Sequence, residues 1–108
     1  MADPHRESLL ILLGHIEREM QTLALWSAQP PEQTAFESDV PFFADTMPFE
    51  QWLQWVFLNR FRAILEGGHP LPDQCSVAPM AEEAIQRIGK DIAPLIASLK
   101  AFDEQFSG

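Results

Sequence analysis

Basic residues are scarce in this sequence, and their scarcity argues against one large class of function. Seven Lys and Arg residues stand against sixteen Asp and Glu residues, so the formal net charge is −9. Proteins that bind nucleic acid use Lys and Arg to displace the counterions of the phosphate backbone. We therefore expect no direct contact with nucleic acid, and expect instead a protein partner with a basic surface.

Cysteine and long apolar runs are scarce as well. The single cysteine, Cys75, cannot form an intramolecular disulfide, which is typical of a reducing compartment. No apolar run approaches the roughly 18 residues that a membrane span needs. The apolar run at residues 9–13 follows a single basic residue, Arg6, and is not typical of a signal peptide. These absences predict a cytoplasmic protein that makes no membrane contact.

The common catalytic and metal-binding motifs are missing from the sequence. It has no glycine-rich phosphate loop, no nucleophile elbow, no CxxC and no HExxH. Glu66 and His69 match the ExxH spacing of di-iron bundles, but the two glycines between them interrupt the helix that such a site needs. Cys75 has no activating base nearby in the sequence, so we interpret it as an ordinary half-buried residue. We predict no catalytic residue, no metal and no cofactor.

Periodic apolar residues fill most of the chain, whose 108 residues fit one domain at 1–108. A first helix is predicted from the cap Asp3-Pro4 to near Trp26, with one apolar seam made by Leu9, Leu13, Ile16, Met20 and Leu23. A second is predicted from about residue 45 to the glycines at 67–68, which terminate it. Its main apolar strip is predicted to hold Phe49, Leu53, Val56, Arg60 and Ile64.

The last third of the chain predicts two shorter helices that share a buried side. The first of them begins at Pro79. Its apolar spacing continues to the C-terminus, but Gly89 and Pro94 are poor residues for a helix interior, so a break is expected near residues 90–93. With no credible strand, the fold class predicted is all-α, an antiparallel four-helix bundle with a long first crossover loop.

The crossover, at about residues 27–45, shows neither helical nor strand periodicity. Connections of this length are uncommon in compact domains. We expect this one to pack across the helices with its phenylalanines in the core; the alternative is a binding loop. The side chains at issue are Phe36, Val40, Phe42 and Phe43.

Aromatic residues concentrate where this crossover meets the second helix. Residues 41–61 hold two of the three tryptophans and five of the eight phenylalanines. The candidates for partner or ligand contact are Phe42, Phe43, Asp45, Trp52 and Trp55, with Trp55 expected to be the exposed tryptophan. For Asp45 the favoured interpretation is a cap of the second helix, and the alternative is a carboxylate offered to a partner's cation.

Several strings in the chain resemble the YqcC-like family of small bacterial proteins. They are PFFADTM at residues 41–47, WLQWV at 52–56, Leu71-Pro72 and APM at 78–80, in the family's order. The sequence departs from the pattern at Asn59, where members often carry proline, and the first helix matches only in character. The resemblance implies a small all-helical protein with no established catalytic residue. The genes of this family often lie beside that of a tRNA pseudouridine synthase, whose name the family has sometimes borne.

Two functions of different classes follow from these observations. The favoured one is a non-enzymatic accessory protein that meets a basic protein partner, associated with an RNA-modifying pathway. The alternative is a small-molecule-binding domain whose pocket lies between the crossover and the second helix. Self-association through the same surface is a third prospect.

Overall fold

The computed structural model describes residues 4–40, 43 and 45–106, and every regular element in them is helical. The all-helical class predicted from the sequence is therefore confirmed. Phe42, one of the candidate site residues, lies outside the described residues, as does the predicted cap Asp3. No described helix has the length and apolar character that crossing a membrane requires.

The first helix, α1 (Pro4–Thr22), buries the predicted seam on one side. Leu9, Leu13, Ile16 and Met20 are fully buried. The helix ends earlier than the expected Trp26 because Ala24 adopts a left-handed conformation with φ of 59°. The Leu25 N–H then donates to the Met20 carbonyl and the Ala24 N–H to the Gln21 carbonyl, which is the Schellman pattern of helix termination.

The second helical run is made of three segments without a gap. These are α2 (Phe49–Trp52), the π-helical segment η3 (Leu53–Leu58) and α3 (Asn59–Glu66). Gly68, with φ of 68°, ends the run as predicted, and the His69 N–H closes back on the Ile64 carbonyl.

The π-helical segment changes which face of this run is buried. In a π-turn residues i and i+5 come into register, and Leu53 and Leu58 are both fully buried. The predicted apolar strip is therefore wrong in its second half, because Arg60 is exposed and Ile64 is only half-buried. Phe61 and Leu65 face the core instead.

Two further helices follow, α4 (Ala78–Ala84) and α5 (Ala93–Glu104), with the short 3₁₀ turn η4 (Gln86–Ile88) between them. The predicted break is confirmed: Gly89 is left-handed, and the Asp91 carboxylate accepts a hydrogen bond from the Ala93 N–H at 3.1 Å. Phe102 of α5 is fully buried and makes edge contacts with Phe57 and Phe61.

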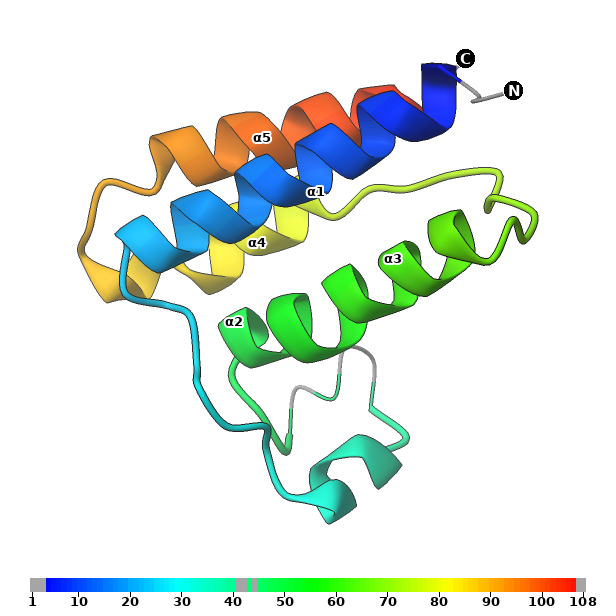
Figure 1. Ribbon diagram of the computed structural model, residues 1–108. Helices are drawn as coiled ribbons and strands as arrows, with labels where there is room; N and C mark the ends of the chain where they lie inside the picture. Colours follow the sequence, from blue (N-terminus) through cyan, green and yellow to red (C-terminus); the bar gives the residue numbers. More distant parts are fainter. Residues whose placement is uncertain (1–3, 41–42, 44, 107–108) are drawn as a thin grey trace.

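The helices form a body from which the crossover projects (Figure 1). α1 and α5 lie side by side and run in opposite directions: the His5 ring contacts that of Phe106 at one end, and Lys90 Nζ donates to the Leu23 carbonyl at the other. α3 lies along α1 through an ion pair of 2.7 Å between Arg62 and Glu17.

Candidate functional site

The crossover forms a separate lobe, defined here as the described residues 27–40, 43 and 45–48, at the lower edge of the molecule (Figure 1). It includes the short 3₁₀ helix η1 (Gln33–Glu37), which the sequence pattern had not indicated. The aromatic side chains Phe36 and Phe43 contact each other edge to face, with ring centroids 6.2 Å apart. Neither belongs to the helical core, so the expectation that the described phenylalanines of the crossover are core residues is wrong.

One buried amide fastens the start of the lobe to the second helical run. Gln54 is 4% exposed and is the buried polar side chain of the core region. Its Oε1 accepts from the Ser27 N–H and its Nε2 donates to the Ser27 carbonyl, both at 2.8 Å. This two-point contact satisfies a backbone N–H and C=O with one side chain and fixes where the chain leaves the body. The sequence pattern did not identify this role for Gln54.

Asp45 lies inside the lobe and does not cap the second helical run. The residue preceding α2 is Pro48, and no side chain caps this end. The Asp45 carboxylate instead accepts a hydrogen bond from the Ser38 hydroxyl. The neighbouring Thr46 hydroxyl donates to the Ala35 carbonyl at 2.7 Å. The predicted cap is therefore wrong, since Asp45 and Thr46 close the lobe on itself.

The predicted aromatic candidates separate onto two sides of the second helical run. Phe43 and Trp55 line one hollow of about 420 Å³, the crossover cavity, whose other walls are Phe36, Val56, Asn59 and Arg60. Trp52 faces elsewhere: it stacks on Phe49 and Phe57 and lines a different hollow. Asp45 lines neither. The structure thus brings Phe43 and Trp55 together and leaves Trp52 and Asp45 apart from them.

Trp55 is half-buried rather than exposed as predicted. Its indole nitrogen, Nε1, is a buried donor without an acceptor. An unpartnered buried donor costs about 1–3 kcal/mol. Beside it, Phe43 holds a left-handed backbone with φ of 52°, an uncommon state for an aromatic residue. These two unfavourable features meet at the crossover cavity.

A second hollow of about 470 Å³, called here the strap cavity, lies between the second helical run and the connection at residues 70–77. Its lining is mostly apolar, and it shares Val56 and Arg60 with the crossover cavity. Arg60 therefore lies between the two hollows.

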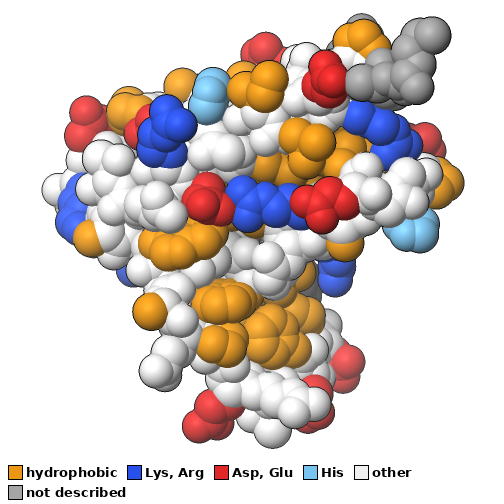
Figure 2. Space-filling model, viewed as in Figure 1, with side chains coloured by type: hydrophobic (Ala, Val, Ile, Leu, Met, Phe, Trp, Pro, Cys, Tyr) orange, Lys and Arg blue, Asp and Glu red, His pale blue; other side chains and the backbone are white. Residues whose placement is uncertain are grey.

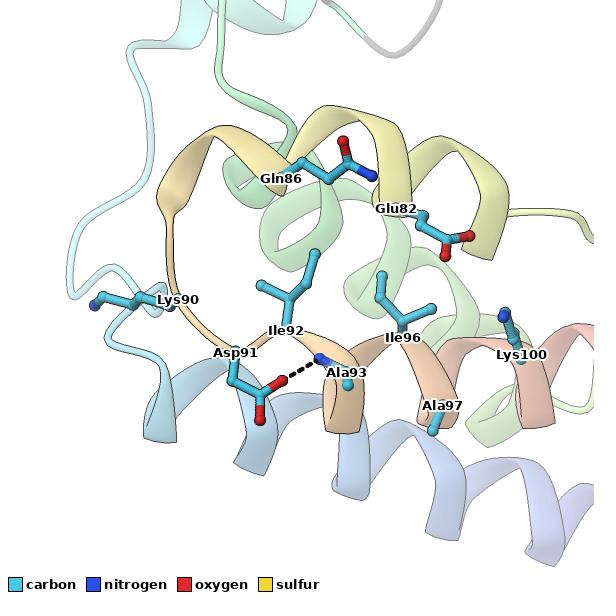
Figure 3. A pocket seen from close by; sticks show the side chains of 9 residues that line it. All are labelled: Glu82, Gln86, Lys90, Asp91, Ile92, Ala93, Ile96, Ala97 and Lys100. Carbon is cyan, nitrogen blue, oxygen red and sulfur yellow. Dashed lines mark hydrogen bonds between the residues drawn. The ribbon is translucent and has the colours of Figure 1, made fainter.

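A third hollow of about 420 Å³ separates α4 from the start of α5 (Figure 3). Ile92, just before α5, and Ile96 of α5 point toward the side chains of Gln86 and Glu82 (Figure 3). Both signs of charge line it, with Glu82 and Asp91 against two lysines, so no single ligand charge is favoured there.

Cys75 is held as a neutral thiol. Its pKa is raised from the ordinary value of 9.0 to about 12, first by burial and then by a hydrogen bond to the Asp103 carboxylate and its negative charge. The same carboxylate accepts from the N–H groups of Val77 and Ala78, at 3.0 and 2.8 Å, where α4 begins. A thiol in this setting is a poor nucleophile, as the sequence predicted.

The acidic residues of the lobe have no basic counterpart nearby in the chain. Residues 19–59 contain six acidic residues and no Lys or Arg. Figure 2 shows hydrophobic side chains on the visible face of the lobe, acidic ones at its edges and no blue Lys or Arg. Among described residues, groups of three or more ligands suited to a metal are absent.

Comparisons with known proteins match nearly the whole chain. The model of the family DUF446, described as tRNA pseudouridine synthase C, matches residues 8–105. An uncharacterised protein of Haemophilus influenzae is 41% identical over 92 residues, covering 85% of this chain and 86% of that protein. The uncharacterised protein YqcC of Escherichia coli is 37% identical over 82 residues, 76% of this chain and 75% of that one.

The name tRNA pseudouridine synthase C is also carried by a much longer relative. A tRNA pseudouridine synthase C of Pectobacterium carotovorum is 49% identical over 60 residues, which are 56% of this chain and only 16% of that protein. The solution structure of Escherichia coli YqcC superimposes with a TM-score of 0.83 at 31% identity, covering 95% of this chain and 88% of that one. The resemblance noted in the sequence is thereby confirmed, and the chain belongs to the YqcC-like family, DUF446.

Proposed function

We propose that this protein is a non-enzymatic accessory protein of the bacterial cytoplasm whose crossover lobe binds a partner with a basic surface. The observation that carries this proposal is the charge of the lobe, which has four acidic residues, Glu32, Glu37, Asp39 and Asp45, and no Lys or Arg. Complementary charge steers association and selects against wrong partners. Phe36, Phe43 and Trp55, outside the core, supply the apolar contact that charge alone does not give.

The finer architecture belongs to this proposal. We take the helical body as one antiparallel four-helix bundle with a long first crossover, since α1 runs opposite to both α5 and α3. In this view the body is a scaffold, and the contact with Gln54 holds the lobe at a fixed place on it.

The partner class we propose is a tRNA pseudouridine synthase. The support is that a protein carrying this name includes a stretch 49% identical to 60 residues of this chain. Since those residues are a small part of that protein, the proposed role here is association with such an enzyme, not its chemistry.

The test is direct binding of the purified chain to tRNA pseudouridine synthase C of the same bacterium, measured by calorimetry. Phe43→Ala with Trp55→Ala should abolish binding and leave the helical circular dichroism unchanged. Leu10→Ala with Ile11→Ala, which removes exposed apolar side chains from α1, is the matched control and should bind normally. If the aromatic double variant unfolds, or if it binds as well as the control, the lobe is not the interface.

The second candidate function, a small-molecule site, is favoured by the crossover cavity with its unpartnered Trp55 Nε1. A ligand at 100 times its dissociation constant would add about 2.7 kcal/mol to the free energy of unfolding. A thermal-shift screen of metabolites measures this directly. Sedimentation of the free chain shows whether a second copy occupies the lobe instead.

A further inference from the structure

The strap cavity has the size and lining of a site for a small organic molecule. It measures about 470 Å³, within the range of ligand pockets, roughly 300–1,000 Å³. Large apolar side chains form most of its wall; those used here are Trp52, Phe57, Phe61, Ile64, Leu71 and Val77.

The charge of this lining is opposite to that of the chain. Arg60 is the one permanently charged side chain among the lining residues, and no carboxylate lines the cavity. Arg60 is exposed and forms no ion pair with any residue that the structure describes. The chain has sixteen acidic residues, but none of them lines this hollow. The unpaired guanidinium of Arg60 therefore favours an anionic ligand there.

Two other ionisable groups lie near the wall, and neither presents a charge among the lining residues. Asp103 lies behind it, but its two oxygens already accept hydrogen bonds from the N–H groups of Val77 and Ala78. The Cys75 thiol, which lines the cavity, stays protonated at neutral pH because burial and Asp103 raise its pKa. Arg60 therefore decides the sign of the ligand.

The connection at residues 70–77, called here the strap, is held at both ends. The hollow is therefore formed before any ligand arrives. Arg6 donates to the His69 carbonyl at 2.7 Å at one end, and Asp103 holds the N–H groups of residues 77–78 at the other. Pro70 and Pro72 restrict the backbone between them. A preformed cavity avoids the cost of ordering a loop when a ligand binds.

We propose that the strap cavity binds an organic carboxylate with an apolar body of about seven to ten carbon atoms. The carboxylate pairs with Arg60, and the apolar body lies against Phe57, Phe61 and the strap. This site is distinct from the lobe and does not depend on the proposed partner.

The probe is sodium octanoate, titrated into the intact chain by calorimetry, with octan-1-ol and octylammonium as matched ligands. Octanoate should bind at one saturable site, and the alcohol and the amine should bind at least about tenfold more weakly, because only the carboxylate makes a charge-assisted pair with a guanidinium. Equal binding of all three, or no saturable octanoate binding at millimolar concentration, would overturn the proposal.

Two arginine variants separate the proposed contact from general charge. Arg60→Gln should weaken octanoate binding about tenfold or more and leave octanol binding unchanged. Arg62→Gln, two residues along the same helix and paired with Glu17, is the control and should change neither. Loss of octanoate binding in both variants alike would contradict a specific role for Arg60.

Because Arg60 also lines the crossover cavity, a separate measurement must show which of the two cavities holds the ligand. Cys75 is the single cysteine, and it lines the strap cavity but not the crossover cavity. Bound octanoate should slow its alkylation at pH 9 in proportion to occupancy, and Ile64→Trp, which fills the cavity, should remove binding. Octanoate that binds without protecting Cys75 occupies another place, and the proposal fails.

Discussion

The helical body and the crossover lobe of this protein are built on different principles. The body is held by apolar burial: Phe102 is fully enclosed by the rings of Phe57, Phe61 and Phe106. Among the described residues of the lobe only Ala35 and Met47 are buried hydrophobics, and polar contacts fasten it, chiefly Gln54 to Ser27 and Thr46 to Ala35. Regions with few buried apolar contacts open locally at a lower free energy. The body should therefore account for most of the free energy of unfolding, and the lobe should be able to change conformation when a partner binds.

The largest expected difference between the two regions is the cost of removing a phenylalanine. Phe102→Ala should lower the free energy of unfolding by about 3–5 kcal/mol, as for other buried aromatic residues. Phe43→Ala, in the lobe, should cost less than about 1.5 kcal/mol. Urea denaturation followed by circular dichroism measures both. Similar costs would mean that the lobe belongs to the core.

The next effect concerns the amide that joins the two regions. Gln54→Ala leaves the N–H and C=O of Ser27 without their partner and should cost about 1–3 kcal/mol. Hydrogen exchange should then accelerate at the backbone amides of the lobe, while those of α1 and α5 keep their protection. Uniform acceleration across the chain would show that lobe and body unfold as one unit.

The sequence was most informative about the helical body. The starts of α4 and α5, a break before α5 and the end of the second helical run could be predicted because glycine, proline and apolar spacing act locally. The buried seam of α1 was predicted for the same reason. α4 ends at Ala84, earlier than the predicted break near residues 90–93. The concentration of aromatic residues located the region at 41–61, and the family resemblance assigned no role within it.

Several of the missed features depend on contacts between residues far apart in the sequence. Gln54 meets a backbone 27 residues away, and Asp103 caps a helix that begins 25 residues before it. The π-helical segment has no local sequence signature, and it moved Arg60 out of the predicted apolar strip. Asp45 had the sequence of a cap, but the chain turned within the lobe and placed Pro48 at the helix start.

A smaller effect of pH on the free energy of unfolding is expected at Cys75, which contacts Asp103 beside the start of α4. The Cys75 pKa is about 12 in the folded chain and 9.0 ordinarily, so the unfolded chain loses this proton first. The stability that the neutral thiol contributes is therefore fully present below about pH 9 and is lost as the pH rises toward 12. Asp103→Asn removes the negative charge beside the thiol, and alkylation of Cys75 at pH 9 should become faster.

The control for this prediction is Asp73→Asn, an exposed acidic residue two positions before the cysteine. It should leave the alkylation rate unchanged. An equal increase in both variants would attribute the effect to overall charge rather than to the contact with Asp103.

The smallest expected effect is at the end of α1, where the body passes into the lobe. Ala24 occupies the left-handed position that glycine adopts without penalty. Ala24→Gly should raise the free energy of unfolding by roughly 0.5 kcal/mol, since relief of the backbone cost exceeds the entropy that glycine adds to the unfolded chain. Thermal unfolding measures this shift, and a lower midpoint would show that Ala24 contributes through its methyl group.

The central claim, that the lobe rather than the body meets a basic partner, is tested most directly by two charge-reversed double variants with equal change in net charge. Glu37→Lys with Asp39→Lys alters the lobe, and Glu82→Lys with Glu83→Lys alters exposed positions of α4. Binding to tRNA pseudouridine synthase C, measured by calorimetry at low and moderate salt, should weaken roughly tenfold or more for the lobe variant alone. Equal weakening of both variants, or of neither, would contradict the account.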